Sequence, residues 1–93
     1  MKEREFTIKN RAGIHCRPSG EILNALNKHY PDHDVEIVFN GETTEITGSM
    51  LALISLGLAC GAKGILRISG PDEENAIREI GDLFEYEFDF PPY

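Results

Sequence analysis

The sequence predicts an α+β fold in which three helices cover one face of a four-stranded, largely antiparallel sheet. Some stretches alternate apolar with polar residues, as strands do, and others place apolar residues three and four positions apart, as helices do. Turn residues such as Asn40-Gly41 separate these stretches. Their order is strand, helix, strand, strand, helix, strand, helix, and the length of 93 residues suits one domain, over residues 1–93.

The first strand and the first helix are predicted from the amino-terminal third of the chain. Phe6 and Ile8 alternate with polar residues, as in a strand with one buried face, and residues 10–13 then form a loop. A helix is predicted over residues 16–29, and Pro31 ends it. Its apolar face consists of Ile22, Leu23, Ala25, Leu26 and Tyr30.

The middle of the chain predicts a hairpin followed by a short helix. Residues 35–39 alternate, Asn40-Gly41 tolerates the positive φ of a tight turn, and residues 42–47 form the returning strand. Ser49 then precedes an apolar stretch, so its hydroxyl is placed to cap a second helix. Gly57 helps to end that helix.

The last part of the chain predicts a strand over residues 64–69, a turn at Gly70-Pro71-Asp72, and a third helix with an acidic first turn. The buried face of that helix consists of Ala76, Ile77, Ile80, Leu83 and Phe84. Residues 85–93 alternate acidic and aromatic side chains. The pattern does not decide whether this tail extends the helix, adds a strand or projects from the domain.

Composition excludes several classes of function. Sixteen acidic against nine basic residues give a net charge of −7, which disfavours binding to nucleic acid. The longest apolar stretch, residues 50–59, is too short for membrane insertion, and the first residues lack a secretory apolar block, so we expect a cytoplasmic protein. Pro31 separates His29 from His33, so we expect no metal site and read both histidines as solvated surface residues.

One short motif carries candidate chemistry. Gly13-Ile14-His15-Cys16-Arg17-Pro18 places a histidine between a glycine loop and a proline suited to the first turn of a helix. A phosphoryl group on the imidazole of His15 can be held there by the backbone amides of Cys16 and Arg17 and by the helix dipole. The guanidinium of Arg17 adds a permanent charge. The alternative is that His15 only lines a loop.

The same motif resembles the active-site signature of the histidine-containing phosphocarrier (HPr) family of the sugar phosphotransferase system. Residues 49–57, Ser-Met-Leu-Ala-Leu-Ile-Ser-Leu-Gly, resemble that family's segment around its regulatory serine. The resemblance covers residues 6–84. It implies an open-faced β-sandwich in a cytoplasmic monomer that needs no cofactor.

The resemblance also implies roles for individual residues. His15 is the residue phosphorylated, on Nδ1, and Arg17 steadies the phosphoryl oxygens. Enzyme I is the donor, and the sugar-specific Enzyme IIA components are the acceptors. Ser49 is the target of an ATP-dependent kinase, HPr kinase/phosphorylase, although an ordinary helix cap explains this serine equally well. Met50, Leu51 and Ile54 form an apolar docking patch, or belong to the core; we expect Met50 and Leu51 to be exposed.

Three other functions compete with a sugar phosphocarrier. The first is a nitrogen-type or regulatory HPr relative in which phosphorylation of His15 controls a partner without sugar uptake, and the second is a binding module that never carries phosphate. The third is a thiol redox protein that uses Cys16, which we instead expect to be a small packing residue. Phosphorylation by phosphoenolpyruvate and Enzyme I separates the carrier from the last two.

Overall fold

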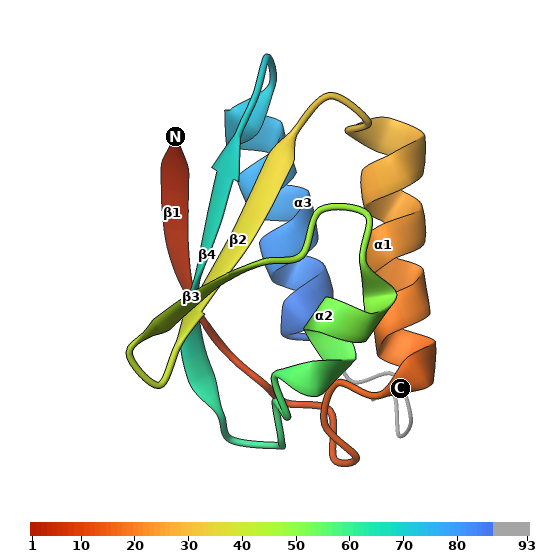
Figure 1. Cartoon of the computed structure of the whole chain (residues 1–93), viewed down its shortest axis with the longest axis vertical. Coiled ribbons are helices and arrows are strands. Elements are labelled where there is room, and N and C mark those ends of the chain that lie inside the picture. The colour runs from red at the N-terminus through yellow and green to blue at the C-terminus, as the bar shows by residue number, and fades with distance from the viewer. Residues whose placement is uncertain (87–93) are drawn as a thin grey trace.

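The computed structural model describes residues 1–86 and has the predicted order βαββαβα (Figure 1). The elements are β1 (Lys2–Thr7), α1 (Cys16–His29), β2 (Asp34–Phe39), β3 (Glu42–Glu45), α2 (Met50–Ser55), β4 (Lys63–Ser69) and α3 (Glu73–Phe84). The predicted α+β fold class is therefore confirmed. The tail from residue 87 to residue 93, whose conformation the sequence did not decide, lies outside the described residues.

The four strands form one sheet in the order β1-β4-β2-β3, and each neighbouring pair is antiparallel. Strand β3 ends at Glu45, two residues earlier than predicted. Beyond it the hydroxyl of Thr47, not a backbone carbonyl, accepts the hydrogen bond from the Val35 amide at 2.8 Å. Ile46 is fully buried, so the chain leaves the ladder here to enter the core.

The core lies between the sheet and the helices, and the helices cover one face of the sheet (Figure 1). Phe6 of β1 packs against Phe84 at the end of α3, with ring centroids 4.9 Å apart. Helix α1 begins and α3 ends at the same end of the molecule, the lower end in Figure 1, where α2 and the loops around residues 8–15 and 56–62 also lie. We call this the lower end.

The expectation that His33 is a solvated surface residue is wrong. Its side chain is 6% exposed, and its Nε2 accepts a hydrogen bond from the Asp72 amide at 3.0 Å. The ring fits because Gly70 has no side chain: a Cβ there would lie 2.3 Å from Cδ2 of His33. His29 is exposed, as expected.

Candidate functional site

The loop that carries His15 is held by buried polar contacts. The side chain of Asn10 is fully buried and donates from Nδ2 to the Gly13 carbonyl at 2.7 Å, while the Gly13 amide donates to the Asn10 carbonyl at 2.9 Å. The next amide, of Ile14, donates to the Leu58 carbonyl at 2.7 Å. Gly13 has φ 75°, a left-handed conformation that suits glycine. The loop is therefore a fixed support for the following histidine.

His15 is the N-cap residue of α1, with φ −110° and ψ −157°. Its carbonyl accepts the helix's first backbone hydrogen bond, from the Ser19 amide at 3.0 Å. The side chain does not cap the helix, and it is half-buried. The half-buried residue thus lies at the positive end of a helix of 14 residues.

The first turn of α1 offers a defined set of donors to an anion. The amides of Cys16 and Arg17 have no acceptor within the helix, and Pro18, at the third helical position, has no N–H. Arg17 is exposed, so its guanidinium is accessible from the solvent. Cys16 is exposed as well, which contradicts the expectation that it is a packing residue. Its first-turn position turns its side chain away from the core.

Helix α2 packs beside α1 at the same end (Figure 1), and it carries exposed apolar side chains. Met50 is 39% and Leu51 75% exposed, as expected for a docking patch, while Ile54 is half-buried. The hydroxyl of Ser49 accepts from the Ala52 amide at 3.1 Å, so the predicted cap is present. The structure therefore gives Ser49 a structural role independent of any modification.

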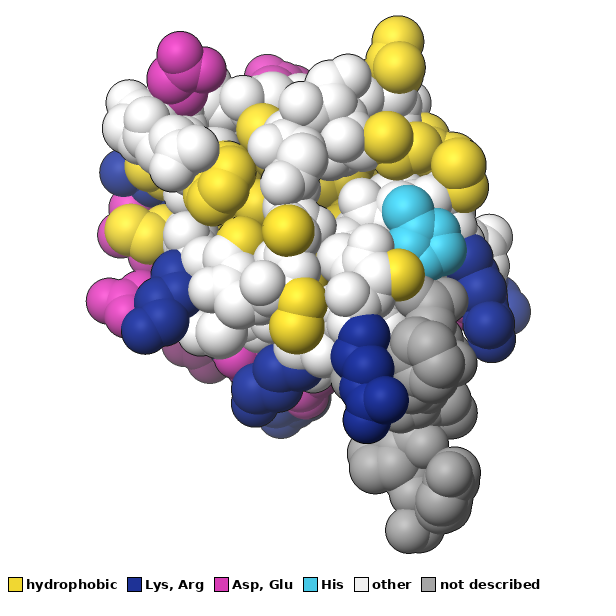
Figure 2. Space-filling view, turned by 90° about the horizontal axis from the view of Figure 1, so that it is seen from below, with side chains coloured by type: hydrophobic (Ala, Val, Ile, Leu, Met, Phe, Trp, Pro, Cys, Tyr) yellow, Lys and Arg dark blue, Asp and Glu magenta, His cyan; other side chains and the backbone are white. Residues whose placement is uncertain are grey.

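The lower end has a charge character that the motif analysis missed. No acidic residue occurs in residues 6–20 or 46–71, although these segments carry Lys9, Arg11, Arg17, Lys63 and Arg67. Figure 2 looks onto this end: hydrophobic side chains gather beside a histidine, basic side chains lie around them, and acidic side chains lie toward the margin of the view. A chain of net charge −7 thus presents a basic face where α1 begins. The sequence already contains the sign of this basic face, as two segments without acidic residues.

The described residues show neither a metal-binding cluster nor a membrane-spanning helix. Among residues 1–86, His, Cys, Asp and Glu side chains form no group of three or more that could hold a metal ion. In the same part of the chain no helix combines the length and the apolar character needed to cross a membrane.

Comparison with known proteins agrees with this geometry. The family model described as "PTS HPr component phosphorylation site" matches residues 2–86. The phosphocarrier protein HPr of Treponema pallidum is 30% identical over 90 residues, which cover 96% of this chain and 98% of that protein. The crystal structure titled HPr-C-His from Thermoanaerobacter tengcongensis has a TM-score of 0.79 at 30% identity and covers 90% of this chain and 91% of that one.

A crystal structure of HPr from Bacillus anthracis shares the fold, with a TM-score of 0.78 at 20% identity, over 88% of this chain and 94% of that one. These matches do not favour the nitrogen-type or regulatory alternative. Sequence motif, fold and relatives agree, and the chain belongs to the HPr phosphocarrier family of the phosphotransferase system.

Proposed function

We propose that this chain accepts a phosphoryl group on His15 from Enzyme I and passes it to sugar-specific Enzyme IIA components. The observation that carries the proposal is the place of His15: a half-buried residue at the N-cap of α1, on a loop fixed by Asn10 and Leu58. A fixed loop favours transfer because the nucleophile needs no ordering before it meets the donor.

In the forward step, the lone pair of the unprotonated Nδ1 of His15 attacks phosphorus, and the bond from phosphorus to the donor atom breaks with its electron pair. Nε2 keeps its proton. The phosphoryl oxygens then accept hydrogen bonds from the Cys16 and Arg17 amides and from the Arg17 guanidinium. Transfer to the acceptor repeats the displacement with His15 as the leaving group, so the carrier returns unchanged.

The proposed docking surface joins the basic lower end to the apolar side chains of α2. Met50 and Leu51 supply exposed apolar area, and half-buried Ile54 supports them. Partners with an acidic rim around an apolar centre fit this surface.

Replacing Leu51 with Gln removes the most exposed apolar side chain of α2. We expect this change to raise the KM for Enzyme I without changing the stability of the domain.

The proposal is tested with phosphoenolpyruvate and Enzyme I, followed by intact mass and an acid-lability assay. We expect one acid-labile phosphate on the parent chain and none on His15→Ala, and His29→Ala is the matched control because His29 is also exposed. Arg17→Ala keeps the amides but loses the guanidinium, so we expect slower transfer, roughly tenfold or more. Labelling of His15→Ala at the parent rate refutes the proposal.

We also propose Ser49 as the regulatory site for an ATP-dependent kinase. The family segment around the serine supports this, and its hydroxyl, on a half-buried residue, accepts a hydrogen bond from the Ala52 amide. An acid-stable phosphate that is absent from Ser49→Ala supports the proposal. Equal labelling of parent and Ser49→Ala refutes it, and leaves the cap as the role of this residue.

A further inference from the structure

The helices leave one face of the sheet uncovered, and we call it the open face (Figure 1). Side chains alternate between the two faces of a strand. Ile37 and Leu66 are buried on the helix side, so Glu36 and Arg67 lie on the open face. The same register assigns five carboxylates and two cations to the open face, which gives it a local charge of −3. These residues are Glu3, Glu5, Asp34, Glu36, Glu45, Lys63 and Arg67.

Two carboxylates of the open face, on β2 and β3, have no cation of their own. Arg67 stands between Glu3 and Glu36 in the register, and its Nε lies 2.6 Å from the Glu3 carboxylate. Glu36 and Glu45 are directly opposite each other, and within residues 1–86 neither forms an ion pair. Like charges in that arrangement destabilise a sheet. A cation supplied from outside the domain is therefore favoured at this pair.

A small apolar centre lies next to these carboxylates. Val38 and Ile65 are paired in the register and half-buried on the open face, and Glu5 and Thr43 flank them. The open face thus has acidic side chains around an apolar centre. The lower end of this same chain, with its cations and its exposed Leu51, fits a partner of that pattern.

The lower end has the opposite balance of charge where α1 begins. The cations of the segment that leads into α1 are Lys9, Arg11 and Arg17. At the end of α3, Asp82 and Glu85 lie 3.0 and 2.9 Å from Nη2 of Arg4, which balances much of their charge. Glu21, in the second turn of α1, lines the groove between α1 and α3 together with Asp82. The four cations of this end therefore outnumber its three carboxylates.

We propose that the open face binds the lower end of a second copy of this chain. The carboxylates of Glu36 and Glu45 on one copy then face Arg11 and Arg17 on the other, and the two apolar centres meet. The contact joins two different surfaces, so each copy of a pair keeps one of them free. It is therefore head to tail, and it does not form a symmetric dimer.

The expected contact is weak. Four strands about 4.8 Å apart and about 20 Å long offer roughly 300 Å², against about 800 Å² per partner in a stable complex. Each copy also has a net charge of −7. In about 0.1 M salt the Debye length is about 10 Å, so this general repulsion is screened across a molecule 33 Å long, whereas charges in contact are screened less. The dilute chain is therefore monomeric, and the copies associate in concentrated solution.

The consequence of the contact rests on the proposed function, although the contact itself does not. The amino end of α1 is covered in one of the two copies, so its His15 is withheld from Enzyme I. Self-association thus competes with phosphorylation. A phosphoryl group on His15 adds negative charge to the lower end and is repelled by Glu36 and Glu45. The phosphorylated carrier therefore separates from its neighbour.

Sedimentation equilibrium at about 0.05–1 mM protein measures the contact without Enzyme I. We expect the apparent mass to rise with concentration in about 0.1 M salt, and to rise less in about 0.5 M salt. Glu36→Gln/Glu45→Gln on the open face and Arg11→Gln/Arg17→Gln at the lower end should each raise the dissociation constant about five- to tenfold. The open-face variant remains folded, because it removes a repulsion within the sheet.

Each variant has a control that changes the net charge equally at exposed residues elsewhere. Asp32→Asn/Glu74→Gln matches the open-face variant, and Lys2→Gln/Lys28→Gln matches the lower-end variant. General repulsion between copies changes equally in a variant and its control, so only a specific contact separates them. Equal dissociation constants in variants and controls overturn the inference. So does a parent chain that keeps the mass of one copy up to about 1 mM.

Mixtures of the two variants test the head-to-tail arrangement. The open-face variant has an intact lower end, and the lower-end variant has an intact open face, so mixing them restores one contact per pair. With the first variant labelled with ¹⁵N, we expect amide shifts where α1 begins and none on β2 and β3; labelling the second should give the reverse. Shifts at both surfaces of one labelled chain, or no restoration on mixing, overturn the inference. Restored contact in a chain that Enzyme I does not phosphorylate refutes the proposed function alone.

Discussion

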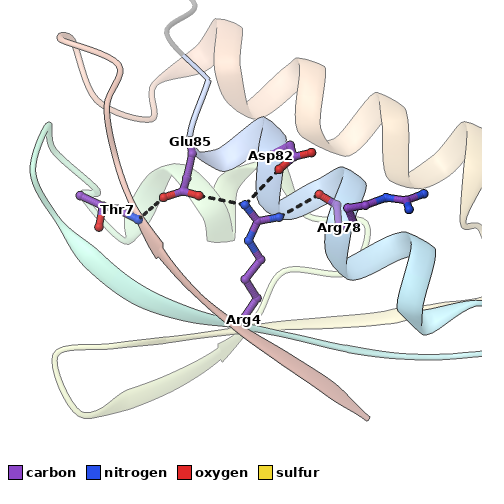
Figure 3. A network of polar contacts seen from close by, with 5 residues as sticks. All are labelled: Arg4, Thr7, Arg78, Asp82 and Glu85. Carbon is purple, nitrogen blue, oxygen red and sulfur yellow. Dashed lines mark hydrogen bonds and ion pairs between the residues drawn. The ribbon is translucent and has the colours of Figure 1, made fainter.

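Nη2 of Arg4 lies 2.9 Å from Oε1 of Glu85, so the first strand holds the residue that ends the last helix. The same guanidinium donates to the Arg78 carbonyl at 2.9 Å and to the Asp82 carboxylate at 3.0 Å, and Glu85 also accepts from the Thr7 amide (Figure 3). A cation at the carboxyl end of α3 is further favoured by the helix dipole. This network joins β1 to α3 across 81 residues of sequence.

Replacing Arg4 with Met keeps an unbranched apolar stem and removes the guanidinium with its charge. We expect the free energy of unfolding to fall by about 1–2 kcal/mol, mostly through the part-buried bond to Glu85, since the exposed bond to Asp82 contributes little. Urea denaturation measures this. Arg4→Lys should recover only part of the loss because one ammonium cannot serve three acceptors in the fork geometry. Full recovery by Lys would contradict this view of the network.

Gly81 makes room for the Arg4 side chain: a Cβ at this position would lie 2.5 Å from Nη1 of Arg4. We expect Gly81→Ala to destabilise the parent because it displaces the guanidinium. In the Arg4→Met background the same change should cost less, or stabilise by up to about 1 kcal/mol through helix propensity. A double-mutant cycle measures this difference. Additive effects of the two changes would rule out the proposed coupling.

Gly13 is predicted to be far less tolerant of alanine than Gly41. Both have positive φ, 75° and 79°, which costs about 1 kcal/mol for an L-residue. A Cβ at Gly13 also meets the Leu58 carbonyl oxygen at 2.6 Å, whereas nothing lies within 4 Å at Gly41. We expect Gly13→Ala to lower the free energy of unfolding by about 2–4 kcal/mol. We also expect it to slow phosphorylation, because the displaced loop moves His15. Equal losses at the two glycines would contradict the prediction.

The pKa of the Tyr30 phenol is raised above 10.0 by burial and by its hydrogen bond to Glu79, 3.0 Å away. Since the folded state keeps this proton longer than the unfolded state, stability is full below pH 10 and falls as pH rises through the folded pKa. Ultraviolet titration of the parent against Tyr30→Phe measures the shift. Glu79→Gln should lower the pKa but leave it above 10.0, because burial remains.

Ser49→Ala removes the cap of α2, and we expect a loss of about 1 kcal/mol in the free energy of unfolding. Ser49→Asp should retain most of the stability because a carboxylate oxygen can accept from the Ala52 amide. Ser55→Ala, at the exposed last residue of α2, is the matched control and should be close to neutral. Thermal melts of the three variants check the order.

Local patterns were sufficient to predict most of the fold. Helix α1 spans Cys16 to His29 as predicted, because its apolar spacing and Pro31 set its limits within one stretch of chain. The Asn40-Gly41 turn was likewise predictable: both residues have positive φ, 53° and 79°. The place of His15 at the start of a helix followed from its own neighbours.

Features that depend on distant contacts were not predictable. His33 is buried because Gly70, from another element, leaves room for its ring, and no pattern near His33 indicates this. The Arg4 network likewise depends on contacts between residues far apart in the sequence. So does the early end of β3, beyond which the Thr47 hydroxyl accepts a hydrogen bond from the Val35 amide. Asn10 and the acid-free segments were visible in the sequence, but their meaning depends on which loops share one end of the fold.

The uneven placement of charge makes this acidic chain electrically asymmetric, with its basic side where α1 begins. An approaching acidic protein therefore exerts a torque before any atoms touch, and it turns the end that carries His15 toward itself. An acidic protein that approaches in another orientation is repelled by the rest of the surface. A larger fraction of collisions therefore gives productive complexes, and no large, slowly dissociating interface is needed.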